Sequence, residues 1–251
     1  MREAPLQNPT VAGHRPVLRR LIERTLQQFY APTCVLCGAP GTGDLDLCEG
    51  CLADLPTNRH CCIHCSQPLP AELPTGTLCG SCQRRPPPFA LCRTAFRYEV
   101  PLPALVGGAK FRARMNLLRL LGQCLALDLL ERNAERPDLL LPVPLHPRRL
   151  RERGYNQALE IARVLGRELS LRVEKHSCAR VLATTPQTGL ERKERRRNVR
   201  GAFRVLRPLE VTRVAIVDDV VTTGSTVSEL ARALLKSGVE RVDVWALART
   251  P

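Results

Sequence analysis

The chain has 251 residues, of which 44% are hydrophobic, so it can bury one large core or two smaller ones. No apolar run approaches the roughly 18 residues that a membrane-spanning helix needs. The N-terminal residues also lack the basic-then-apolar order of a secretory signal. These features exclude an integral membrane protein and predict a cytoplasmic one without membrane insertion.

Lysine and arginine outnumber the acidic residues by 38 to 24, which gives a net charge of +14 and a pI near 9.8. Such a balance favours polyanionic partners such as nucleic acid, or small phosphorylated ligands. A general arginine-rich composition explains the same numbers equally well. Charge alone therefore narrows the class of partner without identifying it.

The composition divides the chain into three parts. Residues 1–16 are polar and contain proline, which predicts a disordered N-terminus. The next part, 17–85, begins with apolar residues at helical spacing and continues into a cysteine-rich stretch. Consecutive prolines at Pro86–Pro88 favour an extended linker. We therefore expect a helix plus a small cysteine-rich domain over 17–85 and a second domain over 86–251.

Ten of the twelve cysteines lie between Cys34 and Cys92. Disulfides are rare in the cytoplasm, so clustered cysteines there indicate metal binding. Eight of them form CxxC pairs, whose two-residue gap lets both sulfurs reach one tetrahedral ion, and all-thiolate sites select zinc. The predicted ligands of two structural zinc sites are Cys34, Cys37, Cys48, Cys51, Cys62, Cys65, Cys79 and Cys82. The sequential pairing and a crossed pairing of these four pairs satisfy the chemistry equally.

Other interpretations of the cysteines fit less well. A redox CxxC normally occurs singly beside a βαβ pattern, and iron–sulfur ligation usually uses other spacings. Cys61 adjoins Cys62, but only Cys62 keeps the two-residue gap. His60 and His64 could replace a cysteine as zinc ligands, but the four complete CxxC pairs favour the cysteines. The remaining three cysteines, Cys92, Cys124 and Cys178, are most simply small core residues.

After the linker, strand and helix patterns alternate, which predicts an α/β domain with a parallel sheet flanked by helices. The expected strands are 138–145, 211–219 and 239–248, with a possible fourth at 171–178. The expected helices are 155–169, with apolar residues along one face, and a second one that begins near Val227 and ends before Gly238.

The segment "VAIVDDVVTTGSTVSEL" (Val214–Leu230) places two acids at the end of a buried strand, directly before a turn of threonine, glycine and serine. Ligands bind at the carboxyl ends of strands in open parallel sheets. The turn precedes a helix N-terminus, whose dipole favours an anion, while paired carboxylates accept hydrogen bonds from a vicinal diol or help to hold Mg²⁺. Neither a P-loop nor a dinucleotide-binding fingerprint is present. The ligand that combines these features is a ribose phosphate. An N-cap turn with solvated aspartates, which binds no ligand, would have the same sequence pattern.

"VAIVDDVVTTGST" resembles the phosphoribosyl-pyrophosphate (PRPP) motif of type I phosphoribosyltransferases. "LPVPLHPRRLRERGYNQALEIA" (Leu141–Ala162) and "RRNVRGAF" (Arg196–Phe203) are similar to segments of the ComF, or competence protein F, family. A double zinc ribbon followed by a phosphoribosyltransferase-like domain matches that family as well. The resemblance covers roughly residues 17–250.

The resemblance implies a role for individual residues. Asp218 and Asp219 would bind the ribose hydroxyls, and Mg²⁺ would accompany PRPP. Arg148 and Arg149 would contact pyrophosphate, and a basic flap from about 184 to 200 would close over the phosphates. The implied flap residues are Gln187, Arg192, Arg196 and Asn198. The implied 5′-phosphate loop consists of Thr222, Thr223, Gly224, Ser225 and Thr226.

Three functions remain open at this point. The resemblance implies a PRPP-binding protein that handles incoming single-stranded DNA in natural transformation, together with a protein partner from the competence machinery. An active phosphoribosyltransferase in nucleotide salvage or synthesis and a PRPP-sensing regulator are the alternatives. No segment reads a nucleobase, and the fold also serves regulators, so the sequence assigns neither an acceptor nor catalytic residues. With only 4% aromatic residues, DNA contacts would be mainly with phosphates and depend on salt.

Overall fold

The computed structural model describes residues 32–112, 114–182 and 199–251. The predicted N-terminal disorder over 1–16 and the helix at the start of 17–85 lie outside the described residues. The described chain forms two compact units, which divide between Asp54 and Leu55. The second set of cysteine pairs therefore shares a unit with the sheet, and the boundary at Pro86–Pro88 stays a prediction from composition.

The first unit contains the first two cysteine pairs and little regular structure. Helix α2 (Glu49–Ala53) is one turn long, and the Cys48 sulfur accepts a hydrogen bond from Cys51 N at its start. Isolated bridges join Thr33 to Pro40 and Thr42 to Leu45. Leu47 is fully buried, but so small a unit has few such residues and depends on other constraints for stability.

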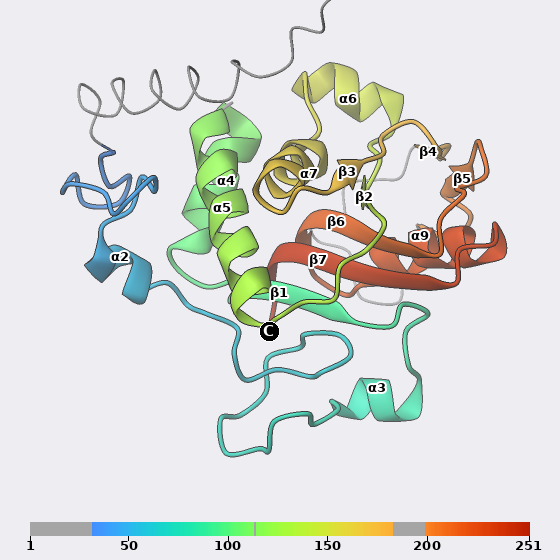
Figure 1. Ribbon diagram of the computed structural model, residues 1–251, viewed down its shortest axis with the longest axis horizontal. Coiled ribbons are helices and arrows are strands. Elements are labelled where there is room, and N and C mark those ends of the chain that lie inside the picture. Colours follow the sequence, from blue (N-terminus) through green and yellow to red (C-terminus); the bar gives the residue numbers. More distant parts are fainter. Residues whose placement is uncertain (1–31, 113, 183–198) are drawn as a thin grey trace, which may run out of the picture. The chain divides into compact units, whose positions relative to one another are not determined.

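The second unit is built on a five-stranded sheet in the order β1-β7-β6-β2-β3, in which every pair is parallel (Figure 1). The strands are β1 (Cys92–Arg97), β2 (Leu139–Pro142), β3 (Arg172–Val173), β6 (Arg213–Val221) and β7 (Arg241–Arg249). The three strands predicted with definite bounds are present, shifted by one to three residues at their ends. Strand β1 was not predicted, because "CRTAFR" is too polar to read as a buried strand.

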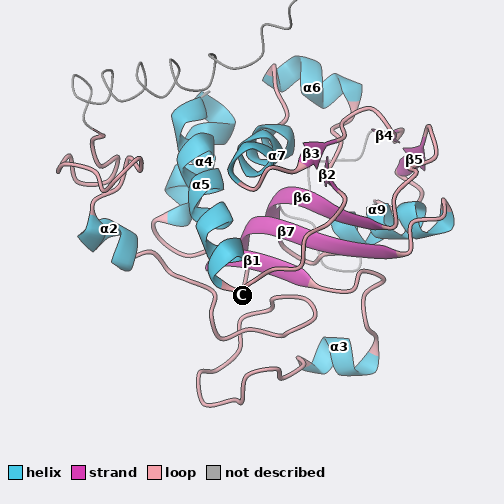
Figure 2. Ribbon diagram, viewed as in Figure 1, coloured by secondary structure: helices cyan, strands magenta, loops and turns pink. Residues whose placement is uncertain are grey.

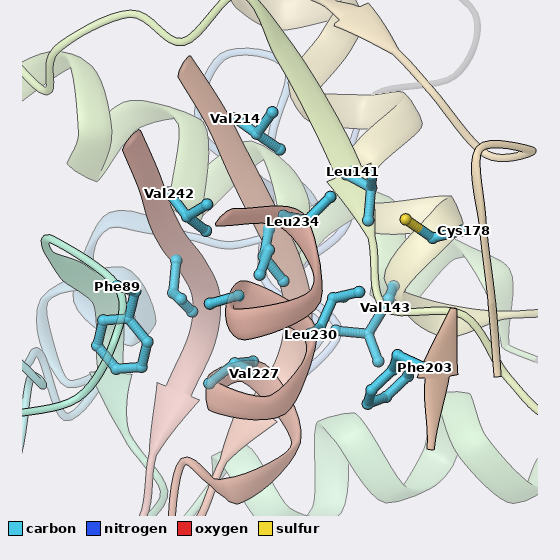
Figure 3. Close-up of a cluster of buried hydrophobic side chains, with 14 of the residues drawn as sticks. Phe89, Leu141, Val143, Cys178, Phe203, Val214, Val227, Leu230, Leu234 and Val242 are labelled. Atoms are coloured by element: carbon cyan, nitrogen blue, oxygen red, sulfur yellow. The ribbon is translucent and has the colours of Figure 1, made fainter. Parts of the chain in front are cut away.

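Two layers of helices cover the sheet (Figure 2). Helix α9 (Ser225–Lys236) packs its buried stripe of Val227, Leu230 and Leu234 against one face, where Leu141 and Val214 lie (Figure 3). Side chains alternate along a strand, so the intervening residues of β2 and β6 point to the other face. Helices α5 (Met115–Glu131) and α7 (Gln157–Glu168) pack there. Both predicted helices are confirmed.

The segment predicted as a possible fourth strand divides into two. Arg172–Val173 pairs with β2, whereas β4 (Cys178–Arg180) leaves the main sheet and pairs antiparallel with β5 (Phe203–Val205). Polar residues between these parts bend the chain, since Glu174 accepts hydrogen bonds from the backbone N–H groups of His176 and Ser177. The resulting two-stranded sheet carries Arg180 into the region beyond the end of β2.

The second cysteine-rich segment, which includes α3 (Gly80–Arg84), is joined to the sheet by buried polar contacts. Asn58 is fully buried and donates to Ser66 O at 2.9 Å and to Thr94 Oγ1 in β1 at 2.8 Å. Ser66 Oγ donates to Cys92 O at 2.6 Å. Buried hydrogen bonds of this kind fix one arrangement, because breaking any of them strands a polar group away from water.

Helices α5 and α7 pack closely against each other. A side chain at Gly122 of α5 would put its Cβ 3.0 Å from Val164 of α7. Helix α4 (Leu102–Arg112) precedes α5, and α6 (Pro147–Arg153) precedes α7. Within the described ranges, no helix combines the length and apolar character needed to cross a membrane.

We predict that Gly122→Val lowers the free energy of unfolding by about 1–3 kcal/mol, because the added methyl groups overpack the α5–α7 contact. Gly107→Val is the matched control, since a Cβ at Gly107 of α4 meets nothing within 4 Å. Urea unfolding of both variants measures the difference. Equal destabilisation by the two substitutions would contradict close packing at Gly122.

Candidate functional site

The carboxyl ends of β2 and β6 lie side by side. Pro142, the last residue of β2, aligns with Val217 of β6, and Val143 N donates to Val217 O at 2.9 Å. Asp218 follows Val217 directly, so the loop after β2 begins beside the two acids. Polar groups from two distant segments therefore meet at the sheet edge where ligands bind in open parallel folds.

The two acids are half-buried and held by their own backbone. Asp218 Oδ1 accepts from Asp219 N at 2.9 Å, and Asp219 Oδ1 accepts from Val220 N at 2.7 Å. These bonds fix the carboxylate orientations before a ligand arrives. Carboxylate oxygens of this kind suit hydroxyl donors or a hard cation.

The turn that follows β6 has the shape of an anion cradle. Gly224 has φ of +71°, a left-handed conformation that side-chain-bearing residues rarely adopt, and it is the N-cap of α9. Thr223 Oγ1 and Ser225 Oγ lie 2.7 Å apart, and Ser225 N donates to Thr223 Oγ1 at 3.3 Å. Glycine has no side chain with which to cap the helix, so backbone N–H groups of the first turn face the loop.

The loop after β2 is fixed from the start of α7. Asn156 caps α7 by accepting from Ala158 N at 3.0 Å, and its Nδ2 donates to Val143 O, also at 3.0 Å. Helix α6 ends at Gly154, whose φ of +81° again requires the left-handed region. The "RERGYNQ" segment thus ends one short helix and begins the next while clamping the loop beside the acids.

The two predicted pyrophosphate contacts differ in their surroundings. Arg148 lies on the exposed side of α6 and pairs with Glu152 at 2.9 Å, with the arginine side chain 76% exposed. Arg149 is half-buried and lies within electrostatic reach of Arg180, whose pKa is lowered first by burial and then by the Arg149 charge. Asp218 acts on the pKa of Arg180 in the opposite direction. The structure thus groups Arg149, Arg180 and Asp218, and leaves Arg148 turned to solvent.

Sequence reasoning missed Arg180. It is 9% exposed, lies in β4, and its guanidinium carbon sits 5.6 Å from the ring centroid of Phe203 in β5. Phe203 closes the "RRNVRGAF" segment, so this segment supplies a platform for an arginine that the sequence places far away. A lone arginine in a short apolar strand gave no signal beyond its charge. The predicted flap residues Gln187, Arg192, Arg196 and Asn198 lie outside the described residues.

The cysteine pairs assemble sequentially into two clusters. Cys34, Cys37, Cys48 and Cys51 form the first, and Cys62, Cys65, Cys79 and Cys82 form the second. In each cluster the four sulfurs lie within 4.8 Å of one another, and the Cys37–Cys48 and Cys65–Cys79 pairs are each 3.6 Å apart. Tetrahedral zinc with Zn–S bonds of about 2.3 Å requires sulfurs about 3.8 Å apart. Both clusters fit zinc.

Backbone surroundings favour the thiolate form at one cysteine in each cluster, whereas neighbouring thiols or burial raise the pKa of Cys37, Cys51, Cys65 and Cys82. Burial opposes ionisation of Cys34 and Cys62, but backbone N–H groups of neighbouring residues outweigh it and lower their pKa values to about 6 and about 7. With four thiolates, each cluster is a closed site without an open position for substrate. The zinc ions would therefore stabilise two zinc ribbons, the first containing Cys34–Cys51 and the second containing Cys62–Cys82. They would not take part in bond making or breaking.

The cysteines and histidines outside the clusters have other roles. Cys92, Cys124 and Cys178 are buried, and burial raises the pKa of each thiol to about 12, as befits inert core residues. His64 Nε2 lies 2.7 Å from Phe89 O and its ring meets Phe89 edge-on, so it packs against the linker. Cys61 and His60 belong to neither cluster.

Three comparisons with known proteins agree with these features. The double zinc ribbon domain family matches residues 25–83. DNA utilization protein YhgH of Escherichia coli O6:H1 is 36% identical over 86% of this chain and 96% of its own length. Competence protein F of Haemophilus influenzae is 34% identical over 89% of this chain and 100% of its own. A purine phosphoribosyltransferase from Pyrococcus horikoshii is structurally similar over 54% of this chain and 74% of its own, with 19% identity and a TM-score of 0.34.

We predict two zinc ions per chain in the unaltered protein and one in either Cys37→Ser or Cys82→Ser, measured by mass spectrometry of the metal. Cys82→Ser also lowers the melting temperature of the unit that holds the sheet, because the second ribbon contributes buried contacts to β1. Cys178→Ala serves as the control and keeps both ions. A protein that folds without zinc and resists chelators would contradict the assignment.

Proposed function

This chain belongs to the family of competence protein F and DNA utilization protein YhgH, and from that premise we propose that it binds PRPP with Mg²⁺ and handles incoming single-stranded DNA in natural transformation. The observation that carries the PRPP part is the juxtaposition at the end of β6. Two oriented carboxylates precede a glycine-containing anion cradle, and Arg180 in β4 lies within electrostatic reach of Arg149 in α6 and of Asp218.

Each part of PRPP finds a chemical counterpart at this edge. The 5′-phosphate suits the loop Thr222–Thr226 at the start of α9, where N–H groups and hydroxyls converge. The ribose diol suits Asp218 and Asp219, because carboxylate oxygens accept hydrogen bonds from hydroxyl groups. The pyrophosphate suits the half-buried Arg149 and the buried Arg180, since guanidinium groups that are partly shielded from water offer strong charge-assisted hydrogen bonds. Asp218 and Asp219 would also be the residues that hold Mg²⁺, which would offset the negative charge of the pyrophosphate.

A second candidate, PRPP sensing, is favoured by one contact. Arg249, at the end of β7, donates to Val221 O at 3.0 Å and to Gln67 Oε1 at 2.9 Å. Val221 immediately precedes the phosphate loop, and Gln67 belongs to the second ribbon. Ordering of the loop by ligand would thus be felt at the ribbon, where a protein partner from the competence machinery could detect it. Pyrophosphate release with a panel of nucleobases separates both roles from an active phosphoribosyltransferase.

We predict that Asp218→Asn combined with Asp219→Asn weakens PRPP binding roughly 100-fold or more, because it removes two charge-assisted hydrogen bonds of about 1.5–3 kcal/mol each. Equilibrium dialysis with labelled PRPP and Mg²⁺ measures the effect. Glu210→Gln with Glu240→Gln removes the same charge at two exposed positions and leaves the affinity unchanged. Unaltered affinity in the aspartate variant, with a native circular dichroism spectrum, would refute the site.

Adjacent arginines allow a sharper test of the pyrophosphate contact. Arg149→Gln should weaken PRPP binding about tenfold or more, while Arg148→Gln, which removes an exposed ion pair, changes it by less than about twofold. Ribose 5-phosphate lacks the pyrophosphate, so its affinity should be the same in both variants. Equal weakening of PRPP binding by the two substitutions would contradict the assigned role of Arg149. So would a loss of ribose 5-phosphate affinity in Arg149→Gln as large as its loss of PRPP affinity.

A further inference from the structure

A cavity of about 520 Å³ lies on the side of α9 that faces the second ribbon. We name it the ribbon groove. One wall comes from the second ribbon and the linker, namely Ser81, Cys82 and 85–89. The other comes from the loop Thr223–Ser225 and from the outward side of α9 between Ser228 and Lys236. The volume falls within the range of about 300–1,000 Å³ that holds small organic ligands. Among the described residues that line it, neither Asp218 nor Asp219 appears, so it adjoins the proposed PRPP pocket without coinciding with it.

The ribbon groove is strongly basic. The side chains that give it this character are Arg85, Arg200, Arg232, Lys236 and Arg249. The one carboxylate among its described lining residues, Glu229, is already engaged, because it accepts from Gly201 N at 2.8 Å and from Arg232 at 2.7 Å. A zinc ion with four thiolates carries a formal charge of −2, and Cys65 and Cys82 bring this charge to one wall. Even with that charge counted, the cations remain in excess.

One of these cations is buried. Arg249 is 4% exposed, and within the described ranges its Nε has no hydrogen-bond partner, although both terminal nitrogens are bonded. The protein encloses these nitrogens, so Arg249 contributes a fixed positive charge to the wall of the groove and not a free donor. Together with the charges of the other four cations, it favours an anionic ligand in the groove.

We propose that the ribbon groove binds the phosphodiester backbone of single-stranded DNA, an inference that rests on the proposed DNA-handling function and adds the place where the strand lies. The cavity admits a stretch of one strand, whereas the two backbones of a duplex stand apart across grooves of about 6 and 12 Å. Phe89 is the one aromatic side chain among the described lining residues, and it is buried. Among these described residues no exposed aromatic ring offers a platform for base stacking, so phosphate contacts carry the affinity there.

The two sites share a wall. Thr223, Gly224 and Ser225 line the ribbon groove and also form part of the proposed 5′-phosphate cradle. A ligand that orders this loop from one side changes the free energy of binding for the ligand on the other side. Such a coupling is reciprocal, so PRPP changes the affinity for the strand by the same factor as the strand changes the affinity for PRPP.

The test measures binding of a labelled oligothymidylate to the full chain by fluorescence anisotropy over a range of salt concentrations. Arg232→Gln with Lys236→Gln removes two groove cations from exposed positions of α9. The matched control is Arg163→Gln with Arg167→Gln on α7, where the exposed pair has the same four-residue spacing and Arg163, like Arg232, pairs with a glutamate three residues earlier.

The groove variant should make the slope of log K against log salt shallower by about 1.4, or about 0.7 for each phosphate that is no longer neutralised, and the control should keep the original slope. Equal slopes in the two variants would overturn the ribbon groove and leave the proposed function standing. No binding by the unaltered protein at low salt would overturn both. A duplex that competes as well as the single strand would overturn the single-strand assignment, and unchanged PRPP binding by the groove variant supports two separate sites.

Discussion

The parallel pairing of β6 with β2 and β7 is the constraint on which the rest of the structure depends. Strand β6 is the central strand of five, and its residues Val214–Val217 are buried, so any slip in register would expose apolar side chains or bury polar ones. Since every pair is parallel, the carboxyl ends of all strands reach one edge. The two acids, the proposed phosphate loop and the loop after β2 therefore all lie at that edge. Helix α9 begins within the proposed phosphate loop.

The composition of the second zinc ribbon suggests a domain separate from the sheet, but the two belong to one compact unit. Asn58, Ser66 and Arg249 tie it to β1 and to the end of β6 through buried hydrogen bonds. Zinc would hold the ribbon rigid, and the rigid ribbon would hold one wall of a basic groove against α9. A metal that takes no part in chemistry would thereby acquire a functional role in the proposed function, because it would fix the distance between the proposed phosphate cradle and the cations beside it.

Much of this arrangement could be predicted from the sequence. CxxC spacing predicted the eight cysteines that form the two clusters, and the buried run before Asp218 predicted the central strand, at whose end the proposed site lies. The pairing of the clusters, the docking of the second ribbon and the place of Arg180 could not be predicted, because each depends on contacts between residues far apart in the chain. Arg249 illustrates the limit, since it reads as the polar end of an apolar strand and only the fold shows that it is buried between ribbon and loop.

The central claim is that the edge beyond β6 is a pocket for PRPP. Calorimetric titration of the zinc-loaded full chain with PRPP and Mg²⁺ tests it most directly, with ribose 5-phosphate and pyrophosphate titrated separately for comparison. We expect one PRPP per chain, bound more tightly than either fragment, because the acids, the cradle and the arginines act on one ligand. The absence of PRPP binding, or binding no tighter than that of pyrophosphate alone, would contradict it.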